Sequence, residues 1–500
     1  MRLKVLLRYF FGVSRWTIQK SIRVGILAGV LILVLIAASA FLSRTKASLQ
    51  PWHFVALSNE FEREIIKKEL TFPQYLALEE QLFEQRQSAY IRNENSDRYS
   101  PMIRYHRDGG NNPDNFSQNY NRTYELVPTE IKGGALLVHG LTDSPYSLRA
   151  VADILVAQGF YVINMRMPGH GTIPSDLLNV TWRDWAAAID IGTKHIKRKI
   201  GNKPFIMAGY SNGGALSLQH ATRALRKGRD VPDGILLFSP AVAVTEFARI
   251  SNWHKVFSWI PYFKKDRWLD ILPEIDPYKY NSFPKNAGRQ SWLLARAIQN
   301  NLTKLYEKQL IDKLPPILTF QSIVDATIVG EAIIDRLYLR LTQPDSELVI
   351  FDLAHSEYLD QLLAVDTGRM LEEIEANNEL PFHLTVLSNK TDRREIEIRR
   401  KAPFSEQVNA EETDLEWPTG VFSLSHVAIL FTPDDPIYGR RALPENTKHI
   451  QLGHLALRGE RKVLLFSSEM LMRLRYNPFF PFMRTKIIEW TNERLKDSRQ

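Results

Sequence analysis

Residues Pro204–Leu216 read PFIMAGYSNGGAL. The apolar-rich run at the start is typical of a buried β-strand, and the sequence after Gly213 continues as a helix-like stretch. Between them, Ser211 lies at the centre of a Gly-x-Ser-x-Gly pattern that begins at Gly209. A serine on a tight turn between strand and helix projects its hydroxyl away from the backbone, and the flanking glycines leave room for that turn. The stretch therefore predicts a nucleophilic serine at the end of a strand.

Similar short apolar runs recur along the chain and alternate with helical stretches. The strand candidates are Ala135–Val138, Tyr161–Met165, Phe205–Ala208, Ile235–Phe238, Ile317–Phe320 and Leu348–Phe351. Amphipathic segments such as Tyr146–Gln158 and Leu216–Arg226 lie between several of them. This alternation requires crossover connections and favours a parallel sheet with helices on both faces. The expected fold class is therefore α/β, with a doubly wound, mostly parallel sheet.

Two regions interrupt this alternation. Residues 241–314 are rich in large aromatic side chains, which suit the core of a helical cap and also the lining of an apolar substrate cleft. Residues 368–418 contain FHLTVLSNKTDRREIEIRRKA, which is typical of an antiparallel hairpin around Asn389–Asp392. We predict a helical stalk and connector over residues 43–130 and the main domain over residues 131–500.

The N-terminal segment determines the predicted topology. Val24–Leu42 is a run of 19 uncharged residues, long enough to cross a hydrocarbon core of about 30 Å as a helix. The basic residues within 1–23 keep that segment cytoplasmic, so the rest of the chain lies across the membrane, in the periplasm if this is a Gram-negative inner membrane. The alternative is a cleaved signal peptide, because Ala38–Ala40 has the small-x-small form that signal peptidase reads.

The composition limits the classes of function. The chain has 500 residues, no cysteine and a formal net charge of +8. The absence of cysteine excludes disulfides, thiolate metal sites and a cysteine nucleophile. No zinc-finger spacing, RNA-binding signature or long basic stripe occurs beyond the N-terminal segment, so no nucleic-acid partner is expected. The histidines form no His-Glu-x-x-His or comparable ligand pattern, so we also expect no metal.

A nucleophilic serine that attacks a carbonyl also needs an oxyanion hole made of two backbone N–H groups. Asn212 directly follows Ser211 and offers one of them. Leu141, in the stretch ALLVHGLTDSPYSL after an earlier predicted strand, offers the other. We interpret His139, in the same stretch, as a structural residue of this loop and not as a base.

Three stretches together resemble the α/β-hydrolase superfamily: LLVHGLTDSPYSLRAVADILVAQGFYVINMRMPGHGT, GYSNGG and QSIVDATI. They look most like its esterase and monoacylglycerol-lipase-like group, also labelled serine aminopeptidase-like, over roughly Gly133–Leu353. PEIDPYKYNSFPKNAG and VFSLSHVAILFTPDDPIYG look like a subgroup of long, N-terminally anchored bacterial hydrolases, which extends the resemblance over most of the chain. The superfamily's order is serine, acid, histidine, and Asp325, in the loop after Ile317–Phe320, fits the acid.

Two histidines are candidates for the base. His355 directly follows the strand Leu348–Phe351, 30 residues after Asp325, a spacing that simple members of the superfamily show. His426 lies much later, in SLSHVAILFTPDD, and the subgroup that the chain resembles carries its histidine in such a segment. A long excursion is tolerated because the loop only has to return the imidazole to the carboxyl edge of the sheet. We therefore assign the base to His426, with His355 as the alternative.

The resemblance implies acyl transfer to water without a cofactor. Ser211 would attack an ester carbonyl, His426 would take its proton and Asp325 would orient the imidazole. The predicted membrane anchor and the aromatic-rich region favour a lipidic or hydrophobic ester. The alternatives are an amidase, thioesterase, peptidase or acyltransferase with the same triad, and a binding protein on an inactive hydrolase fold.

Overall fold

The computed structural model describes residues 20–27, 29–30, 47–55, 57–58, 60, 70–93, 95–242, 261–325, 330–342, 344–364, 366–455, 464 and 466–497. Most of the predicted transmembrane span, residues 24–42, lies outside these ranges, and so do residues 243–260 of the aromatic-rich region. Within the described ranges, no helix combines the length and the apolar character needed to cross a bilayer.

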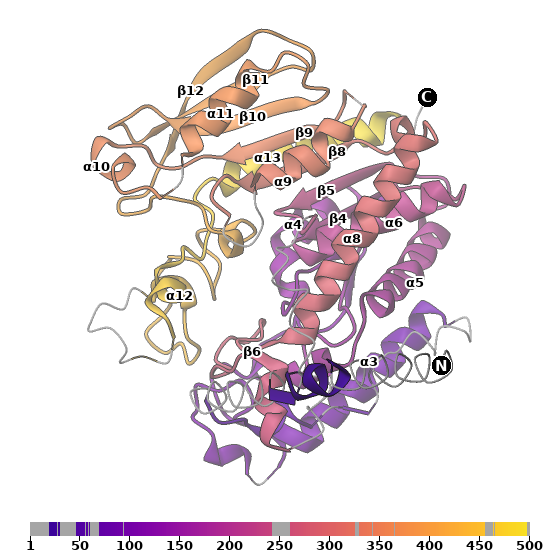
Figure 1. Ribbon diagram of the computed structural model, residues 1–500, viewed down its shortest axis with the longest axis vertical. Helices are drawn as coiled ribbons and strands as arrows, with labels where there is room; N and C mark the ends of the chain where they lie inside the picture. Colours follow the sequence, from indigo (N-terminus) through magenta and orange to yellow (C-terminus); the bar gives the residue numbers. More distant parts are fainter. Residues whose placement is uncertain are drawn as a thin grey trace, which may run out of the picture.

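A ten-stranded sheet forms the centre of the molecule, in the order β1-β3-β2-β4-β5-β8-β9-β10-β11-β12 (Figure 1). Its strands are β1 (Tyr124–Leu126), β2 (Gly133–Val138), β3 (Phe160–Met165), β4 (Phe205–Tyr210), β5 (Gly234–Phe238), β8 (Ile317–Ser322), β9 (Glu347–Phe351), β10 (His383–Asn389), β11 (Glu395–Lys401) and β12 (Val408–Glu416). The block from β3 to β10 is parallel, and β1, β11 and β12 pair antiparallel. The predicted α/β class with a mostly parallel sheet is confirmed.

The six apolar runs predicted as strands correspond to β2, β3, β4, β5, β8 and β9, and every residue of these strands is buried. Continuous apolar runs are expected for strands that are covered on both faces. Alternate side chains of β2 face opposite layers. Leu136 and Val138 belong to one core cluster, and Ala135 and Leu137 belong to another.

Helices cover both faces of the parallel strands (Figure 1). The main α-helices of the described ranges are α4 (Arg149–Ala157), α5 (Trp182–Ile200), α6 (Asn212–Arg226), α8 (Lys285–Glu307), α9 (Gly330–Arg336), α10 (Glu357–Asp360), α11 (Thr367–Ala376), α12 (Ser468–Met472) and α13 (Phe480–Asp497), with α3 (Phe72–Arg86) in the N-terminal region; α10 and α12 lie apart from the parallel strands. Side chains of α5, α6 and α8 share one core cluster. Those of α4 and α13 share the cluster on the opposite face.

The described part of the range predicted as a cap insertion, 241–314, contributes to the core layer. Its main element is α8, which packs against α6. Leu294, Ile298 and Leu302 of α8 are buried in the same cluster as α5 and α6. The range also contains the two short strands β6 (Trp268–Asp270) and β7 (Phe283–Pro284), which form a separate two-stranded sheet.

The hairpin predicted around Asn389–Asp392 is present and extends the main sheet. Strands β10 and β11 pair antiparallel, with Leu384 opposite Lys401, and β10 pairs in parallel with β9. The outermost strand, β12, is largely exposed and was not predicted. Its sequence VNAEETDLE lacks the apolar alternation that identifies a half-buried strand, and Glu411 forms an ion pair with Arg400 of β11.

The described part of the predicted stalk, residues 43–130, packs onto the main domain. Phe72 and Tyr75 of α3 lie in the same core cluster as α5 and α6. Arg166, which directly follows β3, forms buried ion pairs with Glu79 (3.3 Å) and Glu60 (3.1 Å). The N-terminal region is therefore fixed to the sheet through both apolar and charged contacts.

Candidate functional site

Ser211 forms the turn between β4 and α6. Its backbone angles are φ 51° and ψ −114°, a region that residues with a side chain rarely adopt. Three hydrogen bonds hold this conformation. The Ser211 N–H donates to the carbonyl of Phe238 (2.9 Å), and the Ser211 carbonyl accepts from the N–H groups of Ala215 (3.1 Å) and Ala241 (2.9 Å).

The glycines on either side of Ser211 are required by close packing. A Cβ atom on Gly213 would lie 1.9 Å from the carbonyl oxygen of Val138, and one on Gly209 would lie 2.5 Å from the carbonyl of Gly213. Both distances are far below van der Waals contact, and both clashes involve backbone atoms. The prediction that these glycines leave room for the turn is confirmed.

The loop after β2 lies directly against Ser211. A Cβ atom on Gly140 would lie 2.9 Å from the ring of Tyr210 and 3.4 Å from the Cβ of Ser211. Leu141 follows in this loop, and the N–H of Tyr280 braces it by donating to the carbonyl of Thr142 (2.8 Å). Asn212, the other predicted oxyanion donor, is the first residue of α6, where backbone N–H groups have no partner within the helix. Both predicted donors therefore belong to segments that border Ser211.

His139 makes two structural hydrogen bonds at the start of this loop. Its Nε2 accepts from the N–H of Met167 (3.0 Å), so its Nδ1–H donates to the carbonyl of Gly140 (2.8 Å). Burial holds the pKa of His139 well below its ordinary value, so the imidazole is neutral. These contacts support the interpretation of His139 as a structural residue.

The structure brings His426 and Asp325 together, and Tyr210, the residue before Ser211, contacts His426. His426 is the first residue of the short 3-10 helix η11 (His426–Ala428), and its Nδ1 lies 2.6 Å from Oδ2 of Asp325, in the loop after β8. Gln321 donates to the same carboxylate oxygen (3.2 Å). Tyr210, the residue before Ser211, donates its hydroxyl to the carbonyl of His426 (3.2 Å), and their rings are 5.1 Å apart.

The alternative histidine, His355, is held by two other carboxylates. Its Nε2 lies 3.0 Å from Oδ2 of Asp352, and its Nδ1 lies 3.1 Å from Oδ1 of Asp360. The hydrogen bond to Asp352 is the main reason that the pKa of His355 is raised to about 9. At neutral pH the imidazole is therefore protonated and donates from both nitrogens, which is the wrong state for a general base.

Sequence reasoning missed Tyr210 as part of this arrangement. Its hydroxyl fixes the backbone of the histidine loop across 216 positions of the chain. Sequence offers no signal for a contact over such a separation. By contrast, Asp352 and Asp360 lie three and five positions from His355. Their presence was a local signal that this imidazole already has carboxylate partners.

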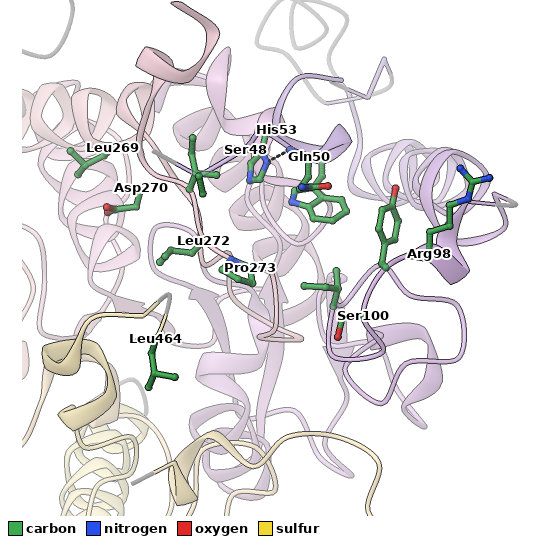
Figure 2. A pocket seen from close by; sticks show the side chains of 15 residues that line it. Ser48, Gln50, His53, Arg98, Ser100, Leu269, Asp270, Leu272, Pro273 and Leu464 are labelled. Atoms are coloured by element: carbon green, nitrogen blue, oxygen red, sulfur yellow. Dashed lines mark hydrogen bonds between the residues drawn. The ribbon is translucent and has the colours of Figure 1, made fainter. Parts of the chain in front are cut away.

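A separate cavity of about 760 Å³ lies in the N-terminal region (Figure 2). Its walls come from residues 47–53, 98–103 and 269–273 and from Leu464, and they include none of the residues predicted to be catalytic. His53 in this wall accepts from the N–H of Gln50 (2.8 Å), as Figure 2 shows, and burial lowers its pKa to about 4.

Across the described ranges, no group of three or more His, Asp or Glu side chains is placed to hold a metal ion.

Comparison with known proteins gives one family match and one curated relative. Residues 129–329 match the family described as serine aminopeptidase, S33. The thermostable monoacylglycerol lipase of Bacillus sp. (strain H-257) is 34% identical over 110 residues, which cover 22% of this chain and 43% of that protein. The chain thus matches less than half the length of this relative.

Solved structures show only distant similarity. One comes from work on the metagenome-derived lipolytic enzymes LipS and LipT (20% identity, TM-score 0.37, 52% of this chain and 98% of that chain). Another is the monoacylglycerol lipase of Paleococcus ferrophilus (19% identity, TM-score 0.34, 46% of this chain and 89% of that chain). The family match contains the Ser211 turn, and together with the Bacillus relative it supports the resemblance to the α/β-hydrolase superfamily and its monoacylglycerol-lipase-like group.

Proposed function

We propose that the protein is a serine hydrolase that cleaves carboxylic esters, with Ser211 as nucleophile and His426 as base. The observation that carries this proposal is the 2.6 Å contact between Nδ1 of His426 and Oδ2 of Asp325. It joins residues 101 positions apart, and the backbone of His426 accepts a hydrogen bond from Tyr210, which precedes Ser211 on its strained strand-to-helix turn. Nucleophile, base and orienting carboxylate are the three parts that acyl transfer of this kind requires.

The proposed reaction proceeds through an acyl-enzyme. Because Asp325 accepts a hydrogen bond from Nδ1–H of His426, Nε2 is the nitrogen that takes the proton of the Ser211 hydroxyl. The serine oxygen attacks the carbonyl carbon of the ester. The N–H groups of Leu141 and Asn212 stabilise the negative charge that develops on the carbonyl oxygen. The imidazolium then protonates the leaving alcohol. Water, activated by the same imidazole, releases the carboxylic acid and restores Ser211.

We further propose that the ester is lipidic and that the protein acts at a membrane. The Bacillus relative is named a monoacylglycerol lipase, which supports a lipidic ester. The uncharged run Val24–Leu42 and the basic segment before it support a single-pass anchor with a cytoplasmic N-terminus and the catalytic domain on the opposite side.

A second candidate activity is hydrolysis of an amide by the same residues, because the matching family is described as a serine aminopeptidase. The two activities share the acyl-enzyme and differ only in the leaving group. Turnover of acyl p-nitrophenyl esters compared with amino-acid p-nitroanilides, on the same preparation, distinguishes them. The ester proposal predicts that the esters are the better substrates.

Covalent labelling tests the assignment of the nucleophile. A fluorophosphonate probe is expected to modify the purified full-length protein on the peptide that contains Ser211 and to leave Ser211→Ala unlabelled. Ser217→Ala is the matched control, because Ser217 is a buried serine of α6 that donates to the carbonyl of Gly213 (3.0 Å); it should still be labelled. Absence of an adduct on Ser211 in the folded protein would refute the proposed function.

A further inference from the structure

The cavity of about 760 Å³ in the N-terminal region has no role in the proposed reaction, because its walls include none of the predicted catalytic residues. Its size lies within the range of about 300–1,000 Å³ that is typical of small-molecule sites. Two of its wall segments, residues 47–53 and 98–103, lie outside the region that matches the family, residues 129–329. The cavity is therefore a feature that this chain adds to the part it shares with that family.

Hydrogen bonds fix two of the wall segments to each other. Nδ1 of His53 accepts from the N–H of Gln50, so its Nε2–H donates to Oγ of Ser282 (2.9 Å). The same hydroxyl accepts from the N–H of Leu272 and donates to the Leu272 carbonyl, both at 3.0 Å. The segment 47–53 is thus attached to the segment 269–273 without a ligand, and a preformed site loses less free energy to ordering when a ligand binds.

The lining of the cavity suits an apolar ligand. The charged side chains that line it are Arg98 and Asp270, which are both exposed, and Figure 2 shows them on opposite sides of the cavity. An apolar chain gains free energy by burial against apolar walls, whereas burial of a charged group in such a place is costly. The aromatic and aliphatic side chains of the lining that are at least partly buried are Trp52, Tyr99, Ile103, Ile271, Leu272 and Pro273.

The wall segments also carry large apolar side chains that face solvent. Leu269 lines the cavity and is 58% exposed. Phe54 and Val55, directly after the first wall segment, are 49% and 44% exposed, and Met102 in the second is 45% exposed. Apolar side chains scattered singly over a surface are ordinary, but a group of them beside a cavity marks a surface that contacts lipid or another apolar partner.

The position of the cavity in the chain points to lipid. Ala47, the first residue of its wall, comes five positions after Leu42, where the predicted membrane span ends. Five residues reach at most about 18 Å. The proposed anchor would therefore hold this wall close to the bilayer surface, where acyl chains are the abundant apolar ligand.

We propose that this cavity binds one acyl chain of a lipid, with the polar head group of the lipid outside among the exposed residues of the walls. The chain can come from a free fatty acid or from a phospholipid of the bilayer. The placement at the membrane rests on the proposed anchor. The cavity itself is separate from the proposed role of Ser211, and it gives the protein a second, non-catalytic site for a lipid.

Photo-crosslinking tests the site on the purified full-length protein in phosphatidylcholine nanodiscs. One arm adds palmitic acid that carries a diazirine on its chain, and the other uses nanodiscs whose phosphatidylcholine carries the diazirine on one acyl chain. Mass spectrometry of the peptides should find adducts within residues 47–53, 98–103 or 269–273. Wall adducts in the fatty-acid arm alone identify the free acid as the source, and wall adducts in the phospholipid arm identify the bilayer. Adducts confined to the predicted span and to the peptides of Ser211 and His426 would overturn the proposal.

A substitution at the opening tests whether the labelled place is this cavity. Leu269→Glu should weaken the apparent Kd for diazirine palmitic acid about ten-fold, because an apolar contact with the chain is replaced by a charge. Leu269 is largely exposed, so the variant is expected to fold. Leu362→Glu is the matched control, because Leu362 is also exposed, at 64%, and is not part of the walls. Equal Kd values for the two variants would refute the site.

The serine variant separates this inference from the proposed function. Ser211→Ala should keep the adducts in the wall segments, because Ser211 does not line the cavity. Wall adducts in a protein that hydrolyses no ester would support the acyl-chain site and count against the hydrolase proposal alone. Ester hydrolysis by a protein whose walls are never labelled would refute the site and leave the hydrolase proposal standing.

Discussion

Replacing His426 and His355 by alanine, one at a time, should separate catalysis from stability. His426→Ala removes the proposed base and leaves Asp325 with its hydrogen bond from Gln321. We expect kcat on a p-nitrophenyl acyl ester to fall by about 10⁴- to 10⁶-fold, the range seen when a triad histidine is removed. His355→Ala should retain turnover, because His355 contacts Asp352 and Asp360 rather than Asp325.

The cost of His355→Ala should be a loss of stability that depends on pH. The change in the pKa of His355 from 6.5 to about 9 stabilises the protonated state by about 2–3 kcal/mol, since each pKa unit is worth about 1.4 kcal/mol and solvent screens part of the effect at a half-buried imidazole. Because the pKa is higher in the folded than in the unfolded protein, this stabilisation is complete below the unfolded value of 6.5. It disappears as the pH rises through about 9.

Urea unfolding of the purified full-length protein, followed at pH 6 and again above pH 9, measures this cost. The free energy of unfolding of His355→Ala should fall below that of the wild type by about 2–3 kcal/mol at the lower pH and approach it at the higher pH. The same unfolding curves establish that His426→Ala is folded when its activity is assayed. If His355→Ala abolishes turnover while His426→Ala does not, the assignment of the base is wrong.

Three further substitutions test the turn and a buried acid. Ser211→Gly should raise the free energy of unfolding by about 1–3 kcal/mol because glycine tolerates this backbone conformation. Ser211→Ala should keep the strained conformation and give no such gain. Urea unfolding measures the free energy of unfolding of both variants. Gly213→Ala should lower the free energy of unfolding by more than about 3 kcal/mol or prevent folding, because the new Cβ would lie 1.9 Å from a carbonyl oxygen. Near-ultraviolet circular dichroism reports the folded fraction of this variant. Burial raises the pKa of Asp176 from 3.8 to about 8, so its contribution to stability is complete below the unfolded value and is lost as the pH rises from 3.8 to about 8. Asp176→Asn should therefore flatten the stability–pH curve between these two values.

Each of these expectations has a clear contrary result. Equal stability of Ser211→Gly and Ser211→Ala would show that the turn is not strained. Gly368→Ala is the control for the loss of a glycine, because a Cβ at this position meets only Asp366 Oδ1, at 3.8 Å. If Gly213→Ala is as stable as Gly368→Ala, the close packing around Gly213 is contradicted. Parallel stability–pH curves for Asp176→Asn and the wild type would show that Asp176 does not titrate in this way.

The parallel strands and the Ser211 turn could be predicted because their signals are local. A strand covered on both faces is a continuous apolar run, and the turn is encoded within five residues, Gly209 to Gly213. The edge strands β1 and β12 were missed because each has one strand neighbour and neither has a buried residue. Helix α8 was assigned to the insertion, although Leu294, Ile298 and Leu302 are spaced as the buried face of a core helix.

The base could not be derived from the residues alone, because both histidines follow plausible loops. Only the three-dimensional arrangement shows that His355 meets Asp352 and Asp360 whereas His426 meets Asp325.

The position of α13 in the sequence has a consequence for biosynthesis. Met483, Ile487 and Trp490 of this helix complete the core cluster on the α4 face of the sheet, and the ring of Trp490 covers Gly234 so closely that a Cβ there would lie 2.5 Å from it. Residues 480–497 leave the ribosome after every other described element. A nascent chain therefore exposes one apolar face of an otherwise complete sheet until α13 has been synthesised, and this interval is when it most needs a chaperone.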